Sequence, residues 1–240
     1  MSDFDRNVAA FPGARAGTSA AVDAGLRAHM IRVYNYMAGG VALTGFVAYF
    51  TNAYFGQALY GSPIMYVLIF APLALVFFLS WRIESLAPAT ARALFFVYAA
   101  LLGASLSIIF AVYTETSIAR VFFISGAAFG GLSLWGYTTQ RDLTGMGSFL
   151  IMGLFGIIIA SLVNIFLAST MMQWIISVVG VLIFAGLTAY DTQRLKNEYV
   201  DGAMDGEVME RSAIMGALAL YLDFLNLFTM LLQLLGSRDE

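Results

Sequence analysis

Long apolar runs separated by short polar breaks make up most of this chain. A helix needs about 20 mostly apolar residues to cross the hydrocarbon core of a bilayer. We place seven such spans along the sequence, at residues 33–52, 62–80, 92–113, 119–138, 146–168, 172–191 and 212–235. The pattern therefore predicts an all-α, polytopic membrane protein with seven transmembrane helices.

The breaks between the spans differ in length, and two of them bear on the predicted fold. The break at about 168–172 is short, which predicts a tight antiparallel hairpin of the fifth and sixth spans. Residues 192–211 are expected to form the only long loop. In the fourth span, Gly126 and Gly130 have the GxxxG spacing that lets helices approach closely, within the monomer or in a dimer.

Composition agrees with a membrane protein. Hydrophobic residues make up 60% of the chain and charged residues only 11%, whereas soluble domains have about 25% charged residues. The formal net charge of -3 gives no reason to expect a nucleic-acid partner. The chain has no cysteine, which excludes disulfides, thiolate metal sites and cysteine nucleophiles.

The two ends of the chain are polar. Residues 1–30 have no continuous apolar core, so they do not resemble a signal peptide, and we expect a short, mobile cytoplasmic tail. Residues 31–236 would form the transmembrane domain and residues 237–240 a C-terminal tail. With the N-terminus inside, ten of the twelve basic residues fall in cytoplasmic segments, and this bias predicts that orientation. The C-terminus is then outside, unless the last span is re-entrant.

Two acidic residues lie within the last two spans. Asp191 ends the sixth span, and Asp223 lies about 11 residues into the seventh, at a rise of about 1.5 Å per residue. A carboxylate at the bilayer centre costs about 2.5–3.5 kcal/mol on insertion scales, so such residues are functional candidates. A start of the seventh span within one turn of Ser212 allows the two carboxyls to lie at a similar depth, and the sequence leaves open whether they are in contact.

A stripe of small and polar residues follows one face of the seventh span. Its members recur at steps of three and four residues, and they are Gly216, Ala219, Asp223, Asn226, Met230 and Gln233. A helix with such a face is expected to contact other helices or a water-filled path rather than lipid. The seventh span is therefore our candidate for a central or pore-lining helix, with Gly216, Ala219, Asn226 and Met230 as the candidate pore-lining residues.

Two neighbouring carboxyls suggest two kinds of chemistry. Held close together they share one proton, because two adjacent negative charges repel, so the pair can act as a proton sensor. Their oxygens are also the ligands that Ca²⁺ prefers, which makes Asp191 and Asp223 candidates for transient calcium binding. A purely structural interpretation is also open: Asp191 would pair with a basic residue such as Arg82, and Asp223 would hydrogen-bond within the bundle.

Several segments resemble the Bax inhibitor-1 (TMBIM) family, in its bacterial branch. The two signature segments match Thr188-Ala189-Tyr190-Asp191-Thr192-Gln193 and Leu220-Tyr221-Leu222-Asp223-Phe224-Leu225-Asn226-Leu227-Phe228. Further matches are Gly103-Ala104-Ser105-Leu106-Ser107-Ile108-Ile109-Phe110 and Gly136-Tyr137-Thr138-Thr139-Gln140-Arg141-Asp142-Leu143. The resemblance covers about residues 25–236.

The resemblance implies a fold and an activity. The fold would have seven helices with the last surrounded by the other six, in the bacterial inner membrane. The activity would be a pH-sensitive calcium leak, with Ca²⁺ as the permeant ion and no cofactor. Asp191 and Asp223 match the family's proton-responsive pair, and Arg82 matches an arginine that latches the closed state. Some members carry a further acid in the second helix, but residues 70–73 have none here.

A rival interpretation belongs to another class of function. The chain could be a non-transporting membrane protein that binds and modulates a membrane protease or other membrane proteins, using its N-terminal tail. An enzyme is not expected. Tyr190-Asp191 matches the first motif of intramembrane aspartyl proteases, but Leu222-Asp223 lacks the glycines of the second.

Overall fold

The computed structural model describes residues 12–201 and 206–238, and the segments 1–11, 202–205 and 239–240 lie outside the described residues. The described residues form helices and one isolated bridge, between Tyr113 and Arg238, with no strand. The elements are α1 (Pro12–Leu59), α2 (Pro63–Arg82), the short 3₁₀ helix η1 (Ile83–Ser85), α3 (Pro88–Leu106), α4 (Ile109–Val112), α5 (Glu115–Thr138), α6 (Thr144–Leu167), α7 (Thr170–Asp201) and α8 (Gly206–Leu235).

Six helical segments of the described chain are long and apolar enough to cross a membrane. They are Pro63–Ser85, Pro88–Val112, Glu115–Thr138, Thr144–Leu167, Thr170–Tyr199 and Gly206–Leu235. The all-α, multi-pass class predicted from the sequence is confirmed. The first predicted span, 33–52, lies within α1, which is not among the six, so the count of seven stays a prediction.

Local sequence signals explain where the helices begin and bend. Pro63 and Pro88 occupy the first position of α2 and α3. Proline has no backbone N–H, and at this position an N–H would have no acceptor within the helix, so no helical hydrogen bond is lost. Pro72 lies inside α2 and removes the hydrogen bond that the carbonyl of Leu68 would otherwise receive. The hydroxyl of Ser105 on α3 donates to that carbonyl instead, so a helix contact compensates the break.

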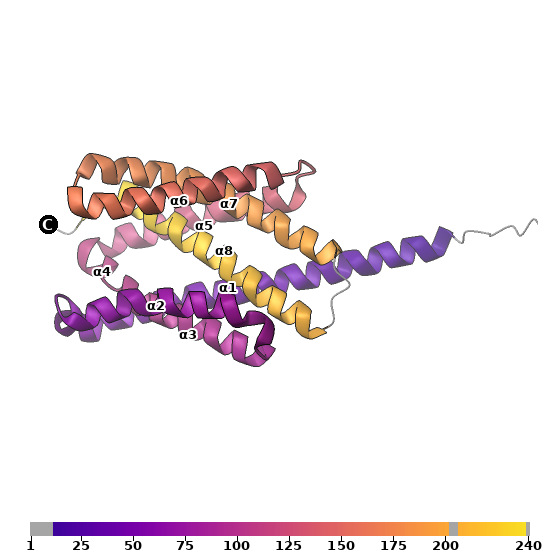
Figure 1. Ribbon diagram of the computed structural model, residues 1–240, viewed down its shortest axis with the longest axis horizontal. Coiled ribbons are helices and arrows are strands. Elements are labelled where there is room, and N and C mark those ends of the chain that lie inside the picture. The colour runs from indigo at the N-terminus through magenta and orange to yellow at the C-terminus, as the bar shows by residue number, and fades with distance from the viewer. Residues whose placement is uncertain (1–11, 202–205, 239–240) are drawn as a thin grey trace, which may run out of the picture.

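The helices form two groups with α8 between them (Figure 1). In this view α1, α2 and α3 lie on one side, α5, α6 and α7 lie on the other, and α8 crosses diagonally between the two groups. It packs against α1, α3, α5 and α7. Half of its most apolar stretch is buried, more than in any of the other five candidate spans.

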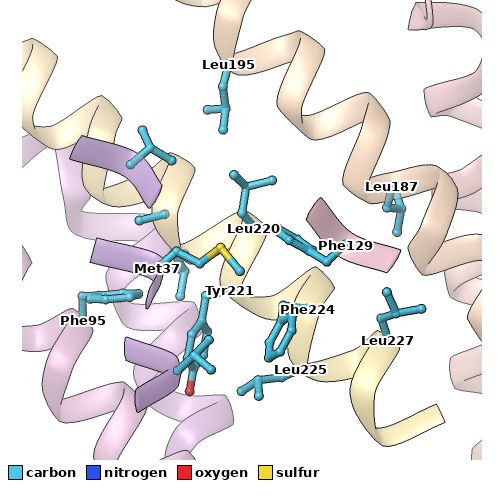
Figure 2. Close-up of a cluster of buried hydrophobic side chains, with 14 of the residues drawn as sticks. Met37, Phe95, Phe129, Leu187, Leu195, Leu220, Tyr221, Phe224, Leu225 and Leu227 are labelled. Atoms are coloured by element: carbon cyan, nitrogen blue, oxygen red, sulfur yellow. The ribbon is translucent and has the colours of Figure 1, made fainter. Parts of the chain in front are cut away.

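The core is built around α8 (Figure 2). On one side, the ring of Tyr221 meets Phe95 of α3 edge to face at 5.7 Å, and its hydroxyl lies 2.6 Å from Thr44 Oγ1 of α1. On the other side, Phe224 meets Phe129 of α5 edge to face at 5.7 Å. The opposite face of α8, which carries Asp223, is therefore turned toward α7.

Three expectations about the chain's polar segments differ from the structure. The predicted loop 192–211 is wrong over most of its length, because α7 continues to Asp201 and α8 begins at Gly206. The chain is helical from Pro12 onward, where we expected a mobile tail to residue 30. Gly126 and Gly130 are exposed, and a Cβ at either would meet nothing within 4 Å, so they make no close helix contact with the part of the chain that the structure describes.

Candidate functional site

Asp191 of α7 and Asp223 of α8 come together inside the bundle. Asp191 is 8% exposed and Asp223 is 5% exposed. Both side chains line the same cleft, and the two carboxyls are close enough for the charge of one to act on the other. Asp223 Oδ2 is fully buried and has no hydrogen-bond partner among the described residues. One oxygen of the pair is therefore available for a proton or for a ligand.

Arg194 supplies the positive charge beside the pair. It lies one helical turn after Asp191 on α7, and its Nη1 is 3.2 Å from Asp191 Oδ1. Its Nε is 3.4 Å from the carboxylate of Glu198. A buried charge is costly unless it is paired, so this guanidinium stabilises the ionised form of Asp191. It has no comparable contact with Asp223.

A cleft of about 790 Å³ opens beside the two aspartates. We call it the lateral cleft, because its walls come from α2, α3, α6, α7 and α8 and include side chains on the outer surface of the bundle. Leu73 on α2 is 50% exposed, and Ile158 and Leu162 on α6 are 47% and 55% exposed. Asp191, Asp223 and Arg194 lie on its inner wall.

A second cavity, of about 920 Å³, lies toward the N-terminal end of α8. We call it the end cavity. Its walls come from α2, η1, α7 and α8, and its charged groups are Glu84, Arg194, Glu198 and Arg211. Arg194 and Ala219 line both the end cavity and the lateral cleft. The two spaces therefore adjoin, with the Arg194 guanidinium at their boundary.

Comparison with known proteins agrees with this architecture. The family model described as "Inhibitor of apoptosis-promoting Bax1" matches residues 26–240. The chain belongs to the Bax inhibitor-1 family. It is 47% identical to "Inner membrane protein YbhL" of Escherichia coli over 220 residues, which cover 90% of this chain and 94% of that protein.

Other bacterial relatives match over similar lengths. An uncharacterized protein of Caulobacter vibrioides is 45% identical, with 100% of each chain covered. "Uncharacterized protein RP147" of Rickettsia prowazekii is 48% identical over 222 residues, 91% of this chain and 93% of that protein. The resemblance found in the sequence is therefore confirmed at the level of the family.

In this family member, the four predicted pore-lining residues all border a cavity. Ala219, Asn226 and Met230 line the lateral cleft, and Gly216 lines the end cavity. A Cβ at Gly216 would come within 2.7 Å of the Leu195 side chain, so this glycine also lets α8 approach α7. Of the residues in the predicted stripe, Gly216 therefore also serves helix packing, whereas Ala219, Asn226 and Met230 line the lateral cleft.

Arg82 does not contact either aspartate in this structure. It is exposed at the end of α2, and none of the ion pairs among the described residues includes it. Arg194, which is not among the site residues predicted from the sequence, occupies the position beside Asp191. The signal was present, because residues three apart share a helical face, but it required the helix to continue past Asp191.

Further polar contacts hold α8 at each end. Near its start, Glu210 accepts hydrogen bonds from Arg32 Nη1 (2.7 Å) and from the Tyr36 hydroxyl of α1. Near its end, the carbonyl of Leu235 accepts from Arg120, and Gln233 Oε1 accepts from Ser177 of α7 at 2.7 Å. These contacts fix α8 against α1, α5 and α7, and thereby fix the position of Asp223.

The site offers few ligands for a resident metal ion. Within the part of the chain that the structure describes, no group of three or more His, Cys, Asp or Glu side chains could hold one. Calcium takes six to eight oxygen ligands in its protein sites, and two carboxylates supply at most four oxygens. The two aspartates alone would therefore leave most of the ligands of a calcium ion to water or to other groups.

Proposed function

We propose that this protein is a pH-sensitive calcium leak channel of the bacterial inner membrane, with Asp191 and Asp223 as its proton sensor. The observation that carries the proposal is the meeting of the two buried carboxyls on the wall of the lateral cleft, beside Arg194, which also lines the end cavity. Membership in the Bax inhibitor-1 family and the relative named as an inner membrane protein support the location.

The sensor follows from the charges on the pair. With one shared proton, the pair carries a single negative charge, and Arg194, which also pairs with Glu198, lies beside it. Loss of that proton leaves two adjacent carboxylates and one guanidinium, and the repulsion favours an arrangement in which α7 and α8 move apart at this level. Protonation of Asp191 would instead release Arg194. In both cases a change in proton occupancy shifts the population between two arrangements of the same helices.

The route for the ion follows from the cavities. We propose seven spans with α8 at their centre and the N-terminus in the cytoplasm, so that the end cavity faces the cytoplasm. Calcium would pass between the end cavity and the far side along the α8 face that carries Ala219, Asn226 and Met230. At the far end, a packed cluster of Tyr113, Ile118, Val121, Phe228 and Leu232 closes the bundle, and it would have to loosen in the conducting arrangement.

We propose that two different arginines hold the aspartate pair, each in a different arrangement of the helices. Arg194 holds Asp191 in the arrangement described here. Arg82 stays a candidate from the family resemblance, and it would engage the pair only if the end of α2 moved inward.

Purified protein in liposomes containing a calcium-sensitive dye tests the proposal. We expect calcium flux that changes between pH 6 and pH 8 in the wild type and is insensitive to pH in Asp191→Asn and in Asp223→Asn. No flux above that of protein-free liposomes, over the whole pH range, would overturn the channel function. Flux with unchanged pH dependence in both variants would overturn the sensor.

One observation favours a second function. The N-terminal part of α1 projects well beyond the other helices (Figure 1), which suits contact with a partner protein such as a membrane protease. Under this alternative, the purified protein gives no calcium flux in liposomes, and deletion of residues 1–22 abolishes partner binding. Under the channel proposal, the aspartates control flux and the deletion is neutral for it.

A further inference from the structure

The lateral cleft has an opening that the calcium proposal does not use. Its mouth lies between α2 and α6, where α2 packs mainly on α3 and α6 packs mainly on α7. The exposed side chains at the mouth are apolar: Leu73 on one side, and Ile158 and Leu162 on the other. All of them belong to candidate membrane spans. The mouth therefore faces the hydrocarbon of the bilayer, and a molecule dissolved in the membrane reaches it without crossing water.

The inner wall of the cleft differs sharply from its mouth. It carries Asp191 and Asp223, both buried, and Asp223 Oδ2 has no hydrogen-bond partner among the described residues. An unpartnered oxygen in an apolar site is costly, so a donor that reaches it gains the free energy of a charge-assisted hydrogen bond. A ligand with an N–H group on a positive centre fits this wall.

The charge count leads to the same ligand class. When both carboxyls are ionised, the pair carries two negative charges, and the one positive charge of Arg194 is shared between Asp191 and Glu198. The site then keeps an excess of negative charge, which a further cation would reduce. Arg194 already lies beside Asp191, so the open position for the second cation is beside Asp223. A monovalent ammonium group supplies both the charge and the N–H donors.

Size and shape fit an amphipathic molecule. A space of about 790 Å³ falls within the usual range for small-molecule sites, about 300–1,000 Å³, which are mostly apolar with a few placed polar groups. The apolar walls of α2 and α6 suit a hydrocarbon chain, and aromatic residues such as Tyr98 and Phe184 lie deeper in the cleft.

We propose that the lateral cleft binds a lipophilic amine from the membrane, with its ammonium group on Asp223 and its hydrocarbon chain between α2 and α6. Such a ligand would neutralise one half of the proposed sensor from within the membrane. The proposal does not depend on calcium conduction, because binding is measured directly and a failure of either leaves the other standing.

Photolabelling of the full chain in lipid nanodiscs tests the site. The probe is dodecylamine with a diazirine on its chain, and the matched neutral probe is the corresponding dodecanol. We expect the amine to label peptides of α2 and α6, and the labelling to fall about tenfold in Asp223→Asn, because the variant removes the charge that pairs with the ammonium group. The alcohol should label more weakly and should not respond to Asp223→Asn.

Two variants on α6 keep the test decisive if Asp223→Asn does not fold. Leu162→Trp narrows the mouth and should lower labelling by the amine several-fold. Phe155→Trp makes a similar change at an exposed position of α6 that does not line the cleft, and it should have no effect. Equal labelling by amine and alcohol, amine labelling that is unchanged in Asp223→Asn, or equal effects of the two tryptophan variants would each overturn the proposal.

Discussion

Arg194 Nη1 lies 3.2 Å from Asp191 Oδ1, across one turn of α7. This contact places a guanidinium at the boundary between the end cavity and the lateral cleft. It also makes the two aspartates unequal, because Asp191 has a cationic partner and Asp223 has none among the described residues.

The first prediction concerns this arginine. Arg194→Gln removes the positive charge that favours the carboxylate form of Asp191. The pH at which calcium flux is half-maximal should therefore move upward in the variant, by an amount that partial solvent exposure of Arg194 keeps modest. Liposome flux measured in half-unit pH steps gives the midpoint.

Arg82→Gln is the matched comparison, since it also removes one arginine from the same end of the bundle. Arg82→Gln should leave the pH of half-maximal flux unchanged if Arg194, and not Arg82, interacts with the two aspartates. A shift in Arg82→Gln together with none in Arg194→Gln would contradict our assignment and would favour the latch that the family resemblance implies.

The second prediction concerns the contact between α5 and α7. A Cβ at Gly136 would lie 2.9 Å from the Cα of Ala189, and backbone cannot move aside as a flexible side chain can. Gly136→Ala should therefore lower the unfolding free energy by about 1–3 kcal/mol, as overpacking does. Thermal unfolding of the detergent-solubilised protein measures the change.

Gly126→Ala is the control on the same helix. Nothing lies within 4 Å of a Cβ there, and alanine is a better helix former by about 0.5–1 kcal/mol. The variant should be neutral or slightly stabilising. Two variants with equal effects would show that α5 and α7 do not approach as closely as described.

The third prediction concerns the break in α2. Pro72 leaves the carbonyl of Leu68 without its helical partner, and Ser105 donates to that carbonyl from α3. Ser105→Ala should cost about 1 kcal/mol of unfolding free energy, the scale of one hydrogen bond between membrane helices. In a Pro72→Ala background the helix can satisfy Leu68 itself, so the same change should cost much less. An equal cost in both backgrounds would show that the Ser105 hydroxyl does not serve this carbonyl.

The fourth prediction concerns acid sensitivity at His29, four residues before the first predicted span. The ring is 2% exposed, lies 5.2 Å from the ring of Tyr199 on α7, and has no hydrogen-bond partner among the described residues. Burial, and secondarily the charge of Arg32, lower the pKa of His29 below its ordinary value of 6.5. Protonation is then harder in the folded protein than in the unfolded chain.

The sign of the effect follows from that difference. The stability contributed by the neutral ring is present above pH 6.5 and is lost as the pH falls below it. His29→Leu should therefore show a smaller fall in Tm than the wild type between pH 7.5 and pH 5.5. Parallel falls in the two proteins would show that the ring is solvated rather than buried against Tyr199.

The apolar pattern predicted the helical class and most of the candidate spans, because a bilayer leaves few alternatives to a helix of about 20 apolar residues. The prediction from this pattern was wrong where a helix continues beyond the apolar run of the sequence. The charged residues after Asp191 predict a loop, but they continue α7 for ten residues to Asp201. For the same reason Arg194 was missed, since its role depends on helical spacing past the end of the apolar run.

The pairing of Asp191 with Asp223 was a hypothesis from the sequence, since spacing along the chain does not fix how α7 and α8 cross. Their contact depends on packing around other residues. Gly216 lets α8 approach Leu195 of α7, and Tyr221 anchors the opposite side of α8 on Thr44. These contacts place Asp223 against α7 rather than against another neighbouring helix.

We propose that Asp191 and Asp223 sense protons for a calcium path. The direct measurement is the pH profile of calcium flux in liposomes for the wild type and for Asp223→Asn, with Asp142→Asn as the control. Asp142 is an exposed carboxylate in the loop after α5, away from the cavities. We expect a pH-dependent flux in the wild type and in Asp142→Asn, and a flux independent of pH in Asp223→Asn. The same pH profile in all three proteins would contradict it.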